Sequence, residues 1–130
     1  MAFKFLLPAL AWGLLILLAI SLPPGNIPRT GLFSLPHFDK LVHVALFAGW
    51  GLLLFAGFRK QKPGSFFQQN PAMIAVAFGL VYGILTELLQ HFCLSGRHGN
   101  YFDVIADVFG TVFGVLLLKW IVRKPSKIFI

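Results

Sequence analysis

Four long apolar stretches dominate this chain, at residues 5–22, 41–58, 72–92 and 104–122. Each approaches the roughly 20 apolar residues with which an α-helix crosses the hydrocarbon core of a bilayer. Charged residues make up only 12% of the sequence, whereas a soluble domain carries about a quarter. Too few charges remain for a surface that faces water. The sequence therefore predicts an all-α membrane protein, in which residues 1–130 form one domain, a four-transmembrane-helix bundle.

Basic residues are divided unequally between the two ends of the predicted spans. With four spans, both termini and the middle loop share one side, and eight of the eleven Lys and Arg residues lie there. Cytoplasmic loops of membrane proteins carry such an excess. We therefore expect both termini to be cytoplasmic (N-in/C-in). This distribution also accounts for the net charge of +7 without a nucleic-acid partner.

Most of the other polar groups lie near the opposite ends of the second, third and fourth spans. The set comprises Asp39, Lys40, His43, Glu87, Gln90, Arg97, Asp103 and Asp107. Several are three or four positions apart and would share one face of a helix. Such a face should point into the bundle, because lipid offers no hydrogen-bond partner. We expect three helices to line an outward-facing polar pocket, with Asp39 and His43 at its edge.

Glu87 is the strongest functional candidate in this set. It lies five positions before the end of its span, about 7–8 Å inside the boundary at the helical rise. A charge at that depth costs several kcal/mol unless it is paired or hydrated. Arg97, on the following loop, could fold back onto it, and Asp107 lies at a similar depth. We assign these three residues as catalytic candidates, and the substrate-binding candidates are Asp39, Lys40, His43, Gln90 and Asp103.

Two other interpretations of the polar residues stay open. They could only lock the helices together, as polar pairs between membrane helices do. They could also form a divalent-metal site from Glu87, Asp103, Asp107 and a histidine. Because their spacing matches no metal-ligand signature, we predict neither a metal nor a cofactor.

The same residues resemble the signature of the VanZ-like membrane proteins. One matching stretch is D-K-x-x-H, from Asp39 to His43, at the start of the second span. The other begins with E-x-x-Q at Glu87 and continues through an Arg to D-x-x-x-D and a GxxxG motif. We interpret that motif, formed by Gly110 and Gly114, as a site of close helix packing. Asp107 departs from the family pattern, where Asn is more frequent.

The resemblance covers most of the chain and implies a bacterial, multi-pass protein of the inner (plasma) membrane. The family is named for a protein that gives low-level resistance to the glycopeptide teicoplanin, which links it to antibiotic resistance and to the cell envelope. We expect the pocket to bind or handle a lipid-linked or lipid-anchored molecule. The expected partners are membrane lipids and a lipid-linked or lipoglycopeptide ligand. The alternatives are a membrane enzyme acting on a lipid-linked substrate, which no nucleophile motif supports, and a proton-coupled carrier, for which four short helices would have to form a homo-oligomer.

Overall fold

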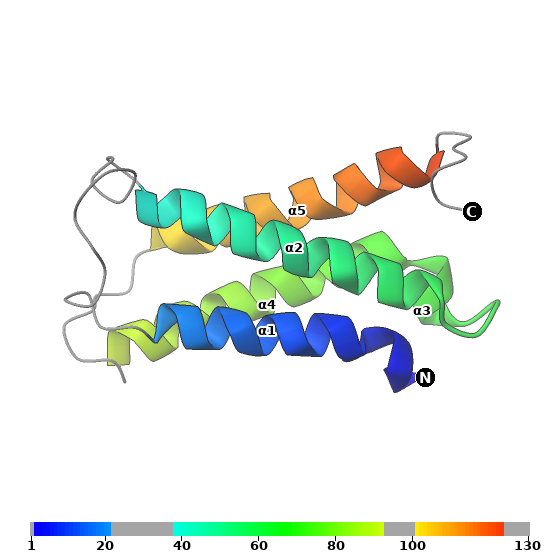
Figure 1. Ribbon diagram of the computed structural model, residues 1–130, viewed down its shortest axis with the longest axis horizontal. Coiled ribbons are helices and arrows are strands. Elements are labelled where there is room, and N and C mark those ends of the chain that lie inside the picture. Colours follow the sequence, from blue (N-terminus) through cyan, green and yellow to red (C-terminus); the bar gives the residue numbers. More distant parts are fainter. Residues whose placement is uncertain (1, 22–37, 93–100, 124–130) are drawn as a thin grey trace.

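The computed structural model describes residues 2–21, 38–92 and 101–123 (Figure 1). All elements in this part of the chain are helical: η1 (Phe3–Leu6), α1 (Leu7–Ile20), α2 (Phe38–Arg59), α3 (Phe66–Gln69), α4 (Pro71–Phe92) and α5 (Tyr101–Arg123). Four helices, counting η1 and α1 as one, are long and apolar enough to cross a membrane. The predicted all-α fold with four spans is therefore confirmed.

The four long helices run antiparallel to their neighbours along the chain (Figure 1). Helix α2 contacts each of the other three, most extensively α5. The start of α2, the end of α4 and the start of α5 consequently meet at one end of the bundle. We call this end, where Lys40, Glu87 and Asp103 lie on their helices, the polar end; α1 begins and α5 ends at the other end of the bundle. Large apolar side chains such as Leu10, Phe78 and Phe113 are exposed on the outer faces, where lipid would cover them.

Glycines bring α2 and α5 into direct backbone contact. A Cβ atom added at Gly110 or Gly114 of α5 would overlap the carbonyl oxygen of Val44 or Ala48 in α2. From the other side, Gly51 of α2 faces the backbone of Thr111. The prediction of close packing at the GxxxG motif is confirmed. This contact fixes which residues of the two helices lie opposite each other.

Hydrogen bonds from aromatic side chains attach α1 to the rest of the bundle. The Trp12 indole donates to the carbonyl of Leu46 at 2.7 Å, and the Trp50 indole donates to the carbonyl of Ala9 at 3.0 Å. The Tyr82 hydroxyl of α4 donates to the carbonyl of Gly13 at 2.6 Å. These bonds satisfy polar atoms that lipid could not, and they position α1 against α2 and α4.

Three features of the helices differ from the sequence-based prediction. Helix α2 begins at Phe38, three residues before the predicted span. The short helix α3, capped by the Ser65 side chain through the Gln68 N–H, lies in a segment that the hydropathy pattern left as a connection. Helix α5 begins at Tyr101, three residues before the predicted span. Asp103 therefore lies in its first turn and shares one buried face with Asp107 and Thr111.

Candidate functional site

Among the described side chains, two contacts between charged or ionisable groups join α2 to α5 at the polar end of the bundle. Lys40 Nζ lies 2.9 Å from Asp103 Oδ1, and His43 Nδ1 lies 2.7 Å from Asp107 Oδ1. Lys40 precedes His43 by three positions and Asp103 precedes Asp107 by four, so one face of each helix supplies both partners. The close backbone contact at Gly110 and Gly114 holds these two faces together.

Asp107 lies at the deepest point of this arrangement, with its side chain 0% exposed. The Thr111 hydroxyl donates to the Asp107 carbonyl oxygen at 2.8 Å, so the two residues are linked along α5. The second carboxylate oxygen of Asp107, Oδ2, has no hydrogen-bond partner among the described residues. On α4, Gly83 faces this carboxylate, and a Cβ added there would lie 3.2 Å from Oδ2. The small residue lets α4 approach the His43–Asp107 pair.

Glu87 brings the third helix into the site. Ligand atoms of His43, Glu87 and Asp103 all lie within 4.8 Å of one another, and all three residues are buried. They come from α2, α4 and α5 respectively. We call Lys40, His43, Glu87, Asp103 and Asp107 the polar cluster. His43, which the sequence placed at the edge of a pocket, lies 2.7 Å from Asp107 on α5 and has a ring nitrogen within 4.8 Å of a carboxylate oxygen of Glu87 on α4.

Of the three remaining predicted site residues, the structure describes the contacts of Gln90 alone. Gln90 is buried, but its amide donates to the carbonyl of Ile20 in α1 at 3.4 Å, which makes it a helix-packing contact. The side chain of Asp39 and the whole of Arg97 lie outside the described residues. Gly83, which sequence reasoning did not assign to the site, lies one turn before Glu87 on α4, and that spacing is the signal that could have identified it.

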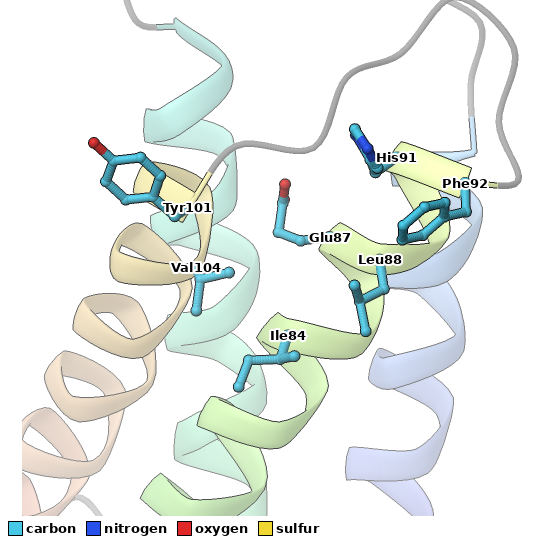
Figure 2. A pocket seen from close by; sticks show the side chains of 7 residues that line it. All are labelled: Ile84, Glu87, Leu88, His91, Phe92, Tyr101 and Val104. Atoms are coloured by element: carbon cyan, nitrogen blue, oxygen red, sulfur yellow. The ribbon is translucent and has the colours of Figure 1, made fainter.

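A pocket of about 350 Å³ opens beside the polar cluster, between α4 and α5. Figure 2 shows Glu87 directed between these two helices, with Leu88 and Ile84 below it and Tyr101 on the α5 side. The lining residues are Ile84, Glu87, Leu88, His91, Phe92, Tyr101 and Val104. Most of them are apolar, and several are exposed on the outer face of the bundle. The described pocket thus differs from the expected polar pocket lined by three helices.

The polar cluster and the pocket offer different kinds of interaction side by side. The cluster supplies carboxylate acceptors, the Lys40 ammonium group as a donor and an imidazole ring oriented by Asp107. The pocket supplies apolar surface. Glu87 belongs to both. A ligand with a polar and an apolar part could therefore contact both regions at once.

The sequence of the chain matches the model of a known family. The sequence model described as VanZ/LLP1 matches residues 5–123, which include every residue of the polar cluster and all of the four spans except the first two residues of the first one. No curated protein and no solved structure matches the chain. A match over most of the sequence shows membership, and the chain therefore belongs to the VanZ/LLP1 family of membrane proteins.

Proposed function

We propose that this protein binds a lipid-linked or lipid-anchored molecule of the bacterial cell envelope. The polar part of the molecule contacts the polar cluster, and its hydrocarbon chain lies in the pocket between α4 and α5. One observation carries the proposal: Glu87 is a member of the cluster and also lines the apolar pocket. An amphiphile is the class of ligand that can bind the polar cluster with its head group and the apolar pocket with its hydrocarbon chain.

The charges of the cluster suit the head group of such a molecule. Lys40 keeps 28% of its side chain exposed while it contacts Asp103, so a phosphate or carboxylate can approach this cationic side chain. Ionic hydrogen bonds of this kind are among the stronger ones in proteins. The carboxylates of Glu87 and Asp103 can accept hydrogen bonds from hydroxyl or amino groups of the head. Arg97 stays a predicted additional donor.

The pocket suits a hydrocarbon chain that enters from the surrounding lipid. Leu88, Phe92 and Ile84 line it and are also exposed on the outer surface of the helices. A chain could thus pass sideways from the bilayer into the pocket without crossing water. Burial of apolar surface would not drive this step, because lipid is equally apolar. Recognition must instead come from the head group and from packing.

The distribution of charge supports an outward orientation of the site. Arg59, Lys119 and Arg123 lie at the end of the bundle away from the polar cluster. With this basic end in the cytoplasm, the cluster faces the outer leaflet of the plasma membrane. Teicoplanin-type lipoglycopeptides and lipid-linked cell-wall precursors both carry a polar head and an acyl or prenyl chain, and both are presented on that side. We therefore include a role in glycopeptide susceptibility in the proposal.

Photo-crosslinking tests whether the pocket holds a hydrocarbon chain. The purified protein in nanodiscs is irradiated with phosphatidylglycerol that carries a diazirine on one acyl chain, and labelled peptides are mapped by mass spectrometry. We expect labelling of the pocket residues of α4 and α5 to fall when Leu88→Trp fills the pocket. Leu80→Trp is the matched control, because Leu80 is exposed on the same helix and does not line the pocket. Equal labelling in both variants and the wild type would refute chain binding at this site.

A second candidate function, catalysis on the same class of molecule, is favoured by the contact between His43 and Asp107. A carboxylate bound to one ring nitrogen fixes the orientation of a histidine that acts as a general base. Incubation with lipid-linked substrates, followed by lipid mass spectrometry, separates this function from binding alone. Conversion by the wild type that is lost in His43→Gln would identify an enzyme. Unchanged lipids with chain labelling intact would leave the binding function.

A further inference from the structure

We propose that His43, Glu87 and Asp103 bind a divalent transition-metal ion, with Asp107 as the residue that orients His43. This site goes beyond the proposed lipid function and does not depend on it. Its three ligands come from α2, α4 and α5, so the ion would join three of the four spans at the polar end of the bundle. The argument rests on geometry, on the surroundings of His43 and on charge.

The distances between the ligand atoms suit one ion. The ligand atoms of the three residues lie within 4.8 Å of one another. Donor atoms bound to one ion at about 2.0–2.2 Å in tetrahedral geometry lie about 3.3–3.6 Å apart, so the side chains would have to close by up to about 1.5 Å when the ion binds. All three residues are buried, which limits the cost of ordering their side chains on binding. Three protein ligands leave coordination positions for water or a ligand oxygen.

The contact between His43 and Asp107 gives the imidazole the arrangement found in metal sites. Metal-binding histidines commonly donate their second N–H to a carboxylate, which fixes the ring and makes the other nitrogen a better ligand. Asp107 Oδ1 lies 2.7 Å from His43 Nδ1, which leaves Nε2 as the nitrogen for the metal. Asp107 also carries the fully buried Oδ2 atom that has no hydrogen-bond partner among the described residues. Gly83 of α4 faces this atom, so the acceptor is directed toward the helix that also carries Glu87.

The charge of the polar cluster favours a cation. In the described part of the chain, the cluster contains the three carboxylates of Glu87, Asp103 and Asp107 and one ammonium group, that of Lys40. Lys40 contacts Oδ1 of Asp103, so the other oxygen of Asp103 can coordinate an ion. Carboxylates buried close together destabilise one another unless protons or cations neutralise them. A dication would do so while it uses both Glu87 and Asp103 as ligands.

The donor set indicates which class of ion fits. Carboxylates alone would suit Mg²⁺ or Ca²⁺, which prefer oxygen ligands. An imidazole together with two carboxylates is typical of first-row transition metals such as Mn²⁺, Fe²⁺ or Zn²⁺. We therefore assign the site to this class, and Mn²⁺ is the useful probe because it gives an electron paramagnetic resonance signal.

Metal binding is tested on the full chain in nanodiscs after treatment with a chelator. Equilibrium dialysis against Mn²⁺ is expected to give about one ion per chain, and pulsed electron paramagnetic resonance is expected to show coupling to an imidazole nitrogen. Asp107→Asn should weaken binding by roughly 10- to 100-fold, because it changes the residue that orients His43. Glu87→Gln should also weaken binding, and His43→Ala should remove the nitrogen coupling.

His91→Ala is the matched control, because His91 lies one turn from Glu87 on α4 but outside the group of three ligands. This variant should bind Mn²⁺ like the wild type and keep the nitrogen coupling. Circular dichroism confirms that each variant is folded before binding is measured. Absence of stoichiometric Mn²⁺, or equal affinity in the wild type, Glu87→Gln and Asp107→Asn, would overturn the proposal. So would nitrogen coupling that disappears in His91→Ala and persists in His43→Ala.

Discussion

Burial makes the contact between His43 and Asp107 sensitive to which partner is removed. In His43→Ala, the Asp107 carboxylate stays buried and loses the imidazole that lies 2.7 Å away. Breaking a buried pair in this way lowers the free energy of unfolding by about 3 kcal/mol or more. In Asp107→Asn, the amide oxygen can still accept from the ring N–H, and we expect a loss of only about 1 kcal/mol. Equilibrium unfolding in mixed micelles measures both changes.

The comparison of these two variants separates a charge effect from a packing effect. If the pair stabilises the protein only by filling space, the free energies of unfolding of His43→Ala and Asp107→Asn differ because the first variant leaves a cavity in place of the ring. The double variant His43→Ala/Asp107→Asn then loses the sum of the two single effects. If the buried charge dominates, the double variant is more stable than that sum predicts, because the uncompensated carboxylate is gone. Additive losses would contradict the interpretation of this contact as an electrostatic pair.

At the level of single residues, the sequence predicted the depth of the polar groups but not their partners. Helical spacing placed Glu87, Asp103 and Asp107 near one end of the spans, and the structure brings their side chains to one cluster. Which partner each residue has depends on the rotation and shift of α2 against α5, and spacing within one helix contains no information on either. Gln90 illustrates this: it shares the polar stripe of Glu87, yet it bonds to α1.

The contact between α2 and α5 depends on the absence of a side chain at Gly114. A Cβ there would overlap the Ala48 carbonyl and lie 3.0 Å from the Ala48 Cα, and backbone atoms cannot rotate away. We expect Gly114→Ala to lower the free energy of unfolding by about 1–3 kcal/mol. It should also weaken the contacts of Lys40 and His43, which hydrogen-exchange mass spectrometry of the first turns of α2 measures.

Gly13→Ala provides the control for this prediction. The nearest atom to a Cβ at Gly13 would be the indole nitrogen of Trp50, at 3.1 Å, which is a much smaller overlap than the one with the Ala48 backbone. Alanine also favours the helix over glycine by about 1 kcal/mol, which offsets part of the crowding. A Gly13→Ala variant less stable than Gly114→Ala would contradict the assignment of α2 and α5 as the tightest helix pair.

Among the elements, the four spans were predictable because each is a long apolar run, which only a membrane-crossing helix explains. The short helix α3 has four residues, too few for any periodicity to emerge, and its signal is local capping by Ser65. The early start of α5 was missed because Tyr101, Phe102 and Asp103 follow a polar segment. There, hydropathy averages do not distinguish the first turn of a helix from the loop before it.

For the whole molecule, the expected orientation is testable by cysteine labelling. In a Cys93→Ala background, Lys62→Cys should react with a membrane-impermeant maleimide only after the cells are opened. Lys62 is exposed and follows α2 at the basic end of the bundle, which we expect in the cytoplasm. Asn26→Cys, in the segment between α1 and α2, should react in intact cells. Labelling of position 62 from outside would reverse the orientation and place the polar cluster on the cytoplasmic side.

The pairing of α2 with α5 also has a consequence for how the protein is made. Lys40 and His43 are synthesised about 60 residues before Asp103 and Asp107, their partners in the finished bundle. During translation, α2 is therefore complete before α5 exists, and the polar groups near one end of α2 have no carboxylate of α5 to bind. It must remain beside the translocon, hold its polar end at the water boundary, or bind a chaperone until α5 arrives. A ribosome stalled before α5 would leave an intermediate that membrane proteases can recognise.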